Sequence, residues 1–179
     1  MTEIVYSQEQ EAIMAQVDRD MDLFLDNWKK SAHQDDAGAI PLAYELAKSA
    51  HRAQFRATGE PYIIHPFAAM NILFELGIVD EHTLAAALIH DVVEDTEVTL
   101  AEVEELLGKD IAELVDGVTK LSRISYSSKE EMQAQNFRKM FLAMARDIRV
   151  VLIKLADRLH NMRTMKFKEP DKQVATARE

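Results

Sequence analysis

The sequence predicts an all-α protein, a compact domain of several packed helices. Glycine and proline are scarce, with five and four among 179 residues, which favours helices over an architecture rich in turns. Apolar residues recur at helical spacing in several segments, and capping-box patterns precede a number of them. The apolar fraction of 47% in a chain of this length is enough for one sizeable core.

The composition excludes several classes of function. A net charge of −10 argues against nonspecific binding to nucleic acids or membrane surfaces, although a metal and local basic residues can still hold a small anionic substrate. The absence of cysteine rules out disulfides and thiolate chemistry. The first residues lack the pattern of a signal peptide, and no apolar run reaches membrane-spanning length. We therefore expect a cytoplasmic protein with no membrane partner and no direct nucleic-acid partner.

The N-terminal part of the chain predicts a long amphipathic helix. Ser7 and Gln10 form a capping-box pattern, and apolar residues follow at helical spacing as far as Trp28. We interpret this stripe as a core-facing surface. We expect residues 1–36 to form an N-terminal helix and linker that packs on a domain made by residues 37–179.

The remainder of the chain predicts further helices separated by short loops. These helices are expected at 40–56, 66–76, 80–96, 99–108, 110–117, 128–145 and 150–165. Gly77, Gly108 and Gly117 are expected at helix ends, where glycine is common. Residues 119–128 lack clean periodicity, so we expect a loop there.

The segment 88–96 is the first candidate for an active site. It places His90 and Asp91 side by side, with Glu94 and Asp95 about one turn later, in an otherwise apolar helix. Residues four apart share a helix face, so the histidine and its neighbour would each lie over one of the later carboxylates. Buried charges need partners or a metal. One helix could thus supply two metal ligands and two supporting carboxylates.

Two other segments carry candidate metal ligands. His65 stands just before a proline, which suits the first position of a helix, and its side chain is free to point away from that helix. Asp157 follows an apolar run in the last helix and forms a polar stripe with Asn161 and Thr164 at helical spacing. Spacing alone leaves two interpretations of Asp157 open, a structural salt bridge with a nearby arginine and a metal ligand.

Together these segments would offer two imidazoles and two carboxylates, from His65, His90, Asp91 and Asp157. Mixed nitrogen and oxygen ligands suit Mn, Fe or Zn better than Mg. An octahedral ion with four protein ligands keeps positions for water, and water of lowered pKa can attack phosphorus. Glu94 or Asp95 could then orient that water or accept its proton. We interpret the remaining histidines, including His51 and His160, as structural or surface residues.

Four segments in this order carry a resemblance to a known family. They read QFRATGEPYIIHP at 54–66, HDVVEDT at 90–96, LVDGVTKL at 114–121 and KLADRLHNMRT at 154–164. With these segments the chain resembles the hydrolase (HD) domain of the bifunctional RelA/SpoT family. The resemblance spans residues 45–165. It implies a compact multi-helix HD-domain fold.

The resemblance also implies an activity and residue roles. Members are Mn²⁺-dependent 3′-pyrophosphohydrolases of guanosine-3′,5′-bis(diphosphate) in the stringent response, which convert ppGpp or pppGpp to GDP or GTP and pyrophosphate. By motif, the metal ligands would be His65, His90, Asp91 and Asp157, and the catalytic carboxylates Glu94 and Asp95. The implied contacts to the guanosine nucleotide are Arg56, Thr58, Asn161 and Thr164. The segment 119–128 matches a region that changes conformation with activity in the family.

The chain differs from the family pattern in two ways, and two alternative functions stay open. Many members carry a basic residue where this chain has Ala57. Long members continue into synthetase and regulatory domains, whereas residues 172–179 resemble the start of a helix cut short, so we expect an N-terminal fragment of a long member. One alternative is a phosphohydrolase of another phosphorylated nucleotide, such as NADPH. The other is a non-catalytic regulatory domain that binds the alarmone.

Overall fold

The fold is described from a computed structural model, which describes residues 6–34, 36–122, 146–167, 171, 173 and 174. Their helices, in chain order, are α1 (Gln8–Ala32), α2 (Ala39–Ala50), α3 (Ile64–Glu75), α4 (Glu81–Leu88), α5 (Val92–Asp95), α6 (Leu100–Leu107), α7 (Lys109–Ser122), α9 (Ile148–Arg163) and the 3₁₀ turn η1 (Met165–Phe167). Within these residues there is no β-strand, only an isolated bridge between Phe55 and Pro61. The predicted all-α class is confirmed.

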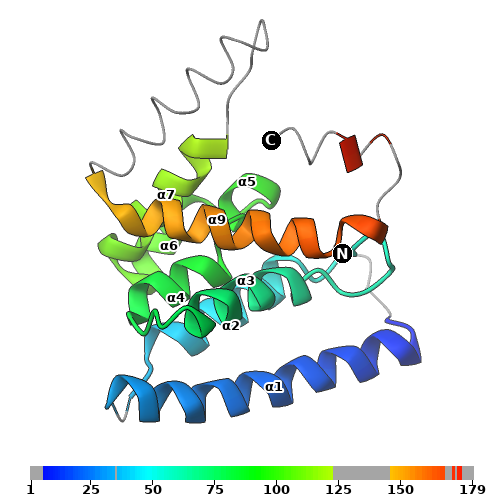
Figure 1. Ribbon diagram of the computed structural model, residues 1–179, viewed down its shortest axis with the longest axis horizontal. Helices are drawn as coiled ribbons and strands as arrows, with labels where there is room; N and C mark the ends of the chain where they lie inside the picture. Colours follow the sequence, from blue (N-terminus) through cyan, green and yellow to red (C-terminus); the bar gives the residue numbers. More distant parts are fainter. Residues whose placement is uncertain (1–5, 35, 123–145, 168–170, 172, 175–179) are drawn as a thin grey trace, which may run out of the picture.

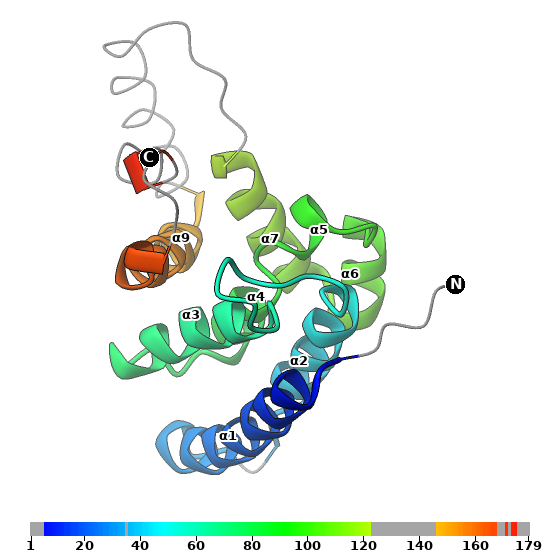
Figure 2. The ribbon, with the colours of Figure 1, turned by 90° about the vertical axis from the view of Figure 1, so that its right-hand side faces the viewer.

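Helix α4 lies at the centre of the fold. It packs against α2, α3, α7 and α9, and its residues from Thr83 to Leu88 are fully buried. Figure 1 shows α9 crossing the molecule above α3 and α4, and in Figure 2 α9 is seen nearly end-on beside α3 and α7. In the part of the chain described here, no helix is both long enough and apolar enough to cross a membrane.

Helix α1 runs along one edge of the molecule (Figure 1) and follows the predicted pattern. The side chain of Ser7 accepts from the backbone of Gln10, and both bonds of the capping box are present. The indole of Trp28 is fully buried and donates to the main-chain oxygen of Val79 at 3.0 Å. The buried face of α1 joins the same hydrophobic core as the other helices. The division at 36/37 stays a prediction.

Helix α2 is shorter than predicted, because the chain turns after Ala50 instead of continuing to Arg56. The segment from Gln54 to Tyr62 folds back on itself as a short hairpin. The backbone N–H of Tyr62 donates to the oxygen of Gln54 at 3.1 Å, and that of Arg56 to the oxygen of Glu60 at 2.8 Å. These cross-hairpin bonds replace the helical ones, so the expected helix was wrong over 51–56.

Helix α7 is longer than predicted, because Gly117 lies inside it and not at its end. A Cβ at Gly117 would lie 2.7 Å from Cγ2 of Val150. The glycine therefore permits close packing of α7 on α9 and does not terminate the helix. Of the expected loop at 119–128, residues 119–122 are helical, and the rest lies outside the described residues, as does the helix expected at 128–145.

Candidate metal centre

The predicted helix through 88–96 is interrupted at the site. Asp80 caps α4 as expected, but α4 ends at Leu88 and α5 begins at Val92. His90 and Asp91 lie in the turn between the two helices. In a continuous α-helix the oxygen of residue 87 would accept from the N–H of residue 91. Here Nδ1 of His90 lies 2.8 Å from that oxygen, so a side chain has taken the place of a helical hydrogen bond.

The turn brings three predicted ligands together among the described residues: His65, His90 and Asp157, whose ligand atoms all lie within 4.8 Å of one another. Nε2 of His65 is 3.2 Å from Oδ1 of Asp157, and Nε2 of His90 is 3.8 Å from the same oxygen. All three side chains are buried. Two ligands about 2.1 Å from one ion lie roughly 3.0 to 3.4 Å apart at octahedral or tetrahedral angles. The observed spacing therefore fits one metal ion with small adjustments.

The protonation of His90 suits a ligand. A carbonyl oxygen can only accept, so Nδ1 of His90 must carry the hydrogen that it donates to Ala87. In the neutral ring, Nε2 then holds a lone pair, and this atom faces Asp157. The main-chain oxygen thus sets both the tautomer and the orientation of the ring, as is usual for metal-binding histidines.

His65 is held in a similar way by a second histidine, His160, from α9. The two Nδ1 atoms lie 2.7 Å apart, so one donates and the other accepts. Burial lowers the pKa of His65. Burial, repulsion from His65 when that ring is protonated, and the charge of Arg56 lower the pKa of His160 to about 4. Both rings are therefore neutral near pH 7. In this arrangement Nε2 of His65 donates to Asp157, so its Nδ1 accepts from His160. Binding of a metal to Nε2 would require the hydrogen to lie on Nδ1, with His160 then acting as the acceptor.

Asp157 is ionised and held on both oxygens. Lys154 lies 2.9 Å from Oδ2, and the amide of Asn161 donates to Oδ1 at 2.6 Å. Burial alone would raise the pKa of Asp157, but the hydrogen bond to His65 and the charges of His90 and Lys154 hold it well below its ordinary value. Spacing left open whether Asp157 forms a structural salt bridge or binds a metal. The structure has features of both, because Asp157 pairs with Lys154 and its Oδ1 faces His65 and His90.

Asp91, the fourth predicted ligand, lies beside the cluster but is directed to other partners. Its Oδ2 is 3.7 Å from Nε2 of His90, yet it accepts from the hydroxyl of Tyr62 at 2.7 Å. Its Oδ1 lies 3.2 Å from Nε2 of His51. Burial would raise the pKa of Asp91, but the neighbouring His90 and His51 hold it far below its ordinary value. Its role as a ligand stays a prediction.

His51 was interpreted as a structural or surface residue, and the structure makes it part of the site. The ring is buried and stacks on Tyr62, with ring centroids 4.5 Å apart. Its Nδ1 lies 2.8 Å from Oε1 of Gln54, and its Nε2 faces Asp91. Both partners accept, so both nitrogens donate and the ring is a cation. Burial would lower the pKa of His51, but Asp91 outweighs burial and raises it.

Three of the residues that contact the predicted ligands or His51 lie within the sequence segments that carry the resemblance. Gln54 and Tyr62 lie in the first segment that carries the resemblance, and His160 lies in the last, three residues after Asp157. Their position within those segments was the one signal that could have identified them as candidates. Nothing local to them indicated which partner each would contact, because every partner is distant in sequence.

Glu94 and Asp95 are exposed, which corrects the prediction that they are buried on the face shared with His90 and Asp91. The break between α4 and α5 removes the helical register on which that prediction depended. Partial burial of the carboxyl and the negative charges of Asp91 and Glu94 raise the pKa of Asp95. Two carboxylates open to solvent therefore lie next in sequence to part of the buried candidate metal centre.

The predicted substrate contacts are partly brought together. Arg56, in the hairpin, donates from Nη2 to Oγ1 of Thr164 at 3.1 Å, across 108 positions in the sequence. Asn161 is bound to Asp157, as the polar stripe on the last helix predicted. Thr58 lies exposed in the hairpin and donates to Glu60 at 2.6 Å. A basic side chain and three polar groups thus lie on segments that adjoin the cluster.

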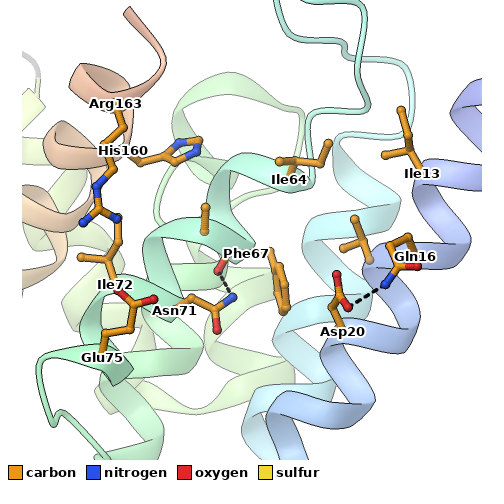
Figure 3. Close-up of a pocket in the computed structure, with 12 residues that line it drawn as sticks. Ile13, Gln16, Asp20, Ile64, Phe67, Asn71, Ile72, Glu75, His160 and Arg163 are labelled. Atoms are coloured by element: carbon orange, nitrogen blue, oxygen red, sulfur yellow. Dashed lines mark hydrogen bonds between the residues drawn. The ribbon is translucent and has the colours of Figure 1, made fainter.

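A groove of about 490 Å³ opens on the other side of His160, between α1, α3 and α9 (Figure 3). Ile64 and Phe67 of α3 line its apolar part. His160 and Arg163 reach it from α9. The ring that contacts His65 is therefore itself accessible from this groove.

The fold and the cluster agree with a comparison to known families. A family model described as HD domain matches residues 43–179, and the chain therefore belongs to the HD-domain family. HD domains are metal-dependent, and His65, His90 and Asp157 are the residues that form a candidate site here. The resemblance seen in the four sequence segments is confirmed.

Curated relatives are much longer than this chain. The chain is 53% identical over 146 residues to the bifunctional (p)ppGpp synthase/hydrolase SpoT of Escherichia coli K12, covering 82% of the chain and 21% of the relative. It is 55% identical over 140 residues to a probable GTP pyrophosphokinase of Mycobacterium leprae, covering 78% of the chain and 17% of the relative. The chain thus spans about a fifth of the length of such relatives.

A solved structure of similar size also matches. It is described as a metazoan ortholog of SpoT that hydrolyzes ppGpp and plays a role in starvation responses. The two chains are 32% identical, with a TM-score of 0.62 over 78% of this chain and 82% of the other. The similarity therefore extends over most of both proteins.

Proposed function

We propose that this chain is a Mn²⁺-dependent hydrolase that removes the 3′-pyrophosphate of ppGpp and pppGpp, and so yields GDP or GTP and pyrophosphate. The observation that carries the proposal is the buried group of His65, His90 and Asp157 next to the exposed carboxylates Glu94 and Asp95. A site for a divalent ion beside solvent-facing acid and base groups suits hydrolysis of a phosphate ester.

The donor set supports Mn²⁺ as the cofactor. Two imidazoles with one or two carboxylates suit Mn, Fe or Zn better than Mg, which prefers oxygen ligands. Asp91 would add a fourth protein ligand to His65, His90 and Asp157. A bound Mn²⁺ would act as a Lewis acid that polarises phosphate and lowers the pKa of water.

Side chains of this protein would accept the proton that the attacking water loses. In this reaction water attacks the phosphorus attached to the 3′ oxygen, and the bond from phosphorus to that oxygen breaks. Water must lose a proton, and the leaving 3′ oxygen must gain one. Asp95, whose pKa is raised by burial, Asp91 and Glu94, suits the proton acceptor. Glu94 would orient the water, while Arg56, Thr58, Asn161 and Thr164 bind the nucleotide.

Two activities, hydrolysis and synthesis, are named among the longer relatives. The site favours hydrolysis as the activity of the region that matches this chain. The printed names of similar proteins include both a synthase/hydrolase and a pyrophosphokinase, at comparable identity. Because the chain spans only about a fifth of these relatives, their names alone do not choose between the two activities. The His and Asp cluster and the solved relative that hydrolyzes ppGpp both support the hydrolase.

The proposal also covers the partner domains and the cellular location of this domain. The bacterial relatives are a bifunctional synthase/hydrolase and a probable pyrophosphokinase, and each is more than three times as long as this chain, so we infer that synthetase and regulatory domains are the partners of this domain. We also propose the cytoplasm as its location. The division into residues 1–36 and 37–179 belongs to the same proposal.

The test is release of pyrophosphate from ppGpp by the purified chain with Mn²⁺ added after chelation. We expect turnover with Mn²⁺ and none without it. NADPH as a parallel substrate tests the first alternative, and turnover of NADPH but not ppGpp would replace the proposal. Tight binding of ppGpp to the Mn²⁺-loaded chain without release of pyrophosphate would instead support the non-catalytic regulatory domain.

A further inference from the structure

A chain of hydrogen bonds connects the candidate metal ligand Asp91 to the helix that carries the catalytic carboxylates. Oδ1 of Asp91 lies 3.2 Å from Nε2 of His51, and Nδ1 of His51 lies 2.8 Å from Oε1 of Gln54. The amide nitrogen of Gln54 then donates to the main-chain oxygen of Asp95 at 2.8 Å. Three side-chain contacts therefore join residues 91 and 95 by a route outside the backbone.

The chemistry of Gln54 suits this link. Its amide accepts from one partner and donates to the other, which neither a carboxylate nor an apolar side chain can do. The orientation of the amide is determined, because a flipped amide would place its oxygen against the oxygen of Asp95. Asparagine is shorter by one methylene group and would not reach both partners.

Helix α5 needs a tether because it is a single turn. It comprises only Val92–Asp95, and forming one turn costs more conformational freedom than its few hydrogen bonds return. Val92 is fully buried and anchors the start of the turn. Glu94 and Asp95 at its end are exposed, and Gln54 holds the backbone at that end.

Gln54 also lies at the base of the hairpin that carries Arg56. Its main-chain oxygen accepts from the N–H of Tyr62 at 3.1 Å, and the hydroxyl of Tyr62 donates to Asp91 at 2.7 Å. One residue thus contacts the buried His51, the substrate hairpin and α5. These are the three parts whose relative positions the proposed reaction requires.

We propose that Gln54 is a positioning residue that ties the catalytic helix α5 to His51 and, through it, to Asp91. The inference rests on the proposed function. Gln54 contacts no reacting atom in this arrangement. Its contribution is to hold the backbone from which Glu94 and Asp95 project, so its loss would affect the chemical step more than binding of metal or substrate.

Two substitutions test the link. Gln54→Glu keeps an acceptor for His51 but places an oxygen against the main-chain oxygen of Asp95, and the neutral, similarly sized Gln54→Met removes both contacts. The matched control is Asn71→Asp on α3, which also removes an amide donor to a main-chain oxygen, that of Phe67 at 3.1 Å, away from the cluster.

The first readout is amide hydrogen exchange of residues 92–96 in the metal-free protein, which does not depend on activity. We expect faster exchange in both Gln54 variants and no change in Asn71→Asp. Calorimetric titration with Mn²⁺ should give an affinity for Gln54→Glu within about threefold of the wild type, because the contact of His51 with Asp91 remains. Unchanged exchange at 92–96 would refute the tether.

The second readout separates kcat from KM for ppGpp. A displacement of catalytic groups on the order of 1 Å costs about 100-fold in rate, so we expect kcat 10- to 100-fold lower with KM within about twofold. Equal loss in Asn71→Asp, or unchanged kcat in both Gln54 variants of an active protein, would overturn the inference. An inactive wild type would refute the proposed function instead, and hydrogen exchange would still decide whether Gln54 tethers α5.

Discussion

His65 and His160 face each other through their Nδ1 atoms at 2.7 Å, although they come from α3 and α9. The contact ties a predicted metal ligand to a residue outside the predicted set. The buried His65 ring is therefore fixed at both nitrogens, by His160 at Nδ1 and by Asp157 at Nε2.

Replacing His160 should weaken metal binding. Without an acceptor for Nδ1 of His65, the tautomer with a free Nε2 loses its support, and loss of such an outer partner lowers metal affinity about 10- to 100-fold. His160→Ala should show this loss in a calorimetric titration with Mn²⁺, and His160→Gln, which keeps an acceptor oxygen, should retain more affinity. His82→Ala is the control, because His82 is exposed and pairs with Asp110. Equal affinity in His160→Ala and the control would contradict the role of His160.

Asp157→Asn should abolish metal binding and the stabilisation that comes with it. An ion that binds only the folded protein stabilises it by about 2.7 kcal/mol at a free concentration 100 times Kd. We therefore expect Mn²⁺ to raise the melting temperature of the wild type and to leave that of Asp157→Asn unchanged. The control Asp18→Asn removes a carboxylate that pairs with Lys48 far from the cluster, and should still respond to Mn²⁺. A rise in melting temperature for Asp157→Asn would reject Asp157 as a ligand.

Gly117→Ala should destabilise the packing of α7 on α9. A Cβ would meet Cγ2 of Val150 at 2.7 Å, and such overpacking costs about 1 to 3 kcal/mol, more than the ~1 kcal/mol that alanine gains over glycine in a helix. We expect a lower free energy of unfolding in urea. The double variant Gly117→Ala/Val150→Ala should recover part of it. Gly38→Ala is the control, since nothing lies within 4 Å of its Cβ position, and equal losses at both glycines would argue against the overlap.

Arg149 should stabilise the fold in a pH-dependent way. Its guanidinium lies 3.0 Å from Asp110 and 2.7 Å from Asp147, and its hydrogen bonds lower the pKa of both carboxyls. A depressed pKa stabilises the folded state above the unfolded pKa of about 3.9, and this stabilisation is lost as pH falls through the folded pKa. The difference in melting temperature between wild type and Arg149→Met should therefore be full at pH 6 and shrink toward pH 3.

The control for the pH series is Lys109→Met. In the wild type, Lys109 pairs with Glu113, and both side chains are largely exposed. Exposed pairs contribute about 0 to 1 kcal/mol, so this variant should follow the wild type at each pH. A constant difference between Arg149→Met and the wild type from pH 6 to pH 3 would show that Arg149 acts by packing and not through its carboxylates.

The sequence by itself determined what depends on neighbours three or four positions apart. The capping box predicted at Ser7 forms, and the structure has a capping box at Thr99 and a cap at Asp147, because each needs only a side chain and the first turn that follows it. The all-α class follows from the same local rules. The candidate ligands His65, His90 and Asp157 were also identified in advance, because polar groups in apolar segments require partners.

Tertiary structure decided what depends on contacts between distant segments. Gly117 is helical because α9 packs against it, and the helix expected through 88–96 breaks because His90 bonds to Ala87 inside a crowded core. The roles of His51 and His160 likewise come from partners 40 and 95 positions away. Local propensity contributes fractions of a kcal/mol per residue, whereas burial and pairing of polar groups contribute several, so where the two conflict the packed structure prevails.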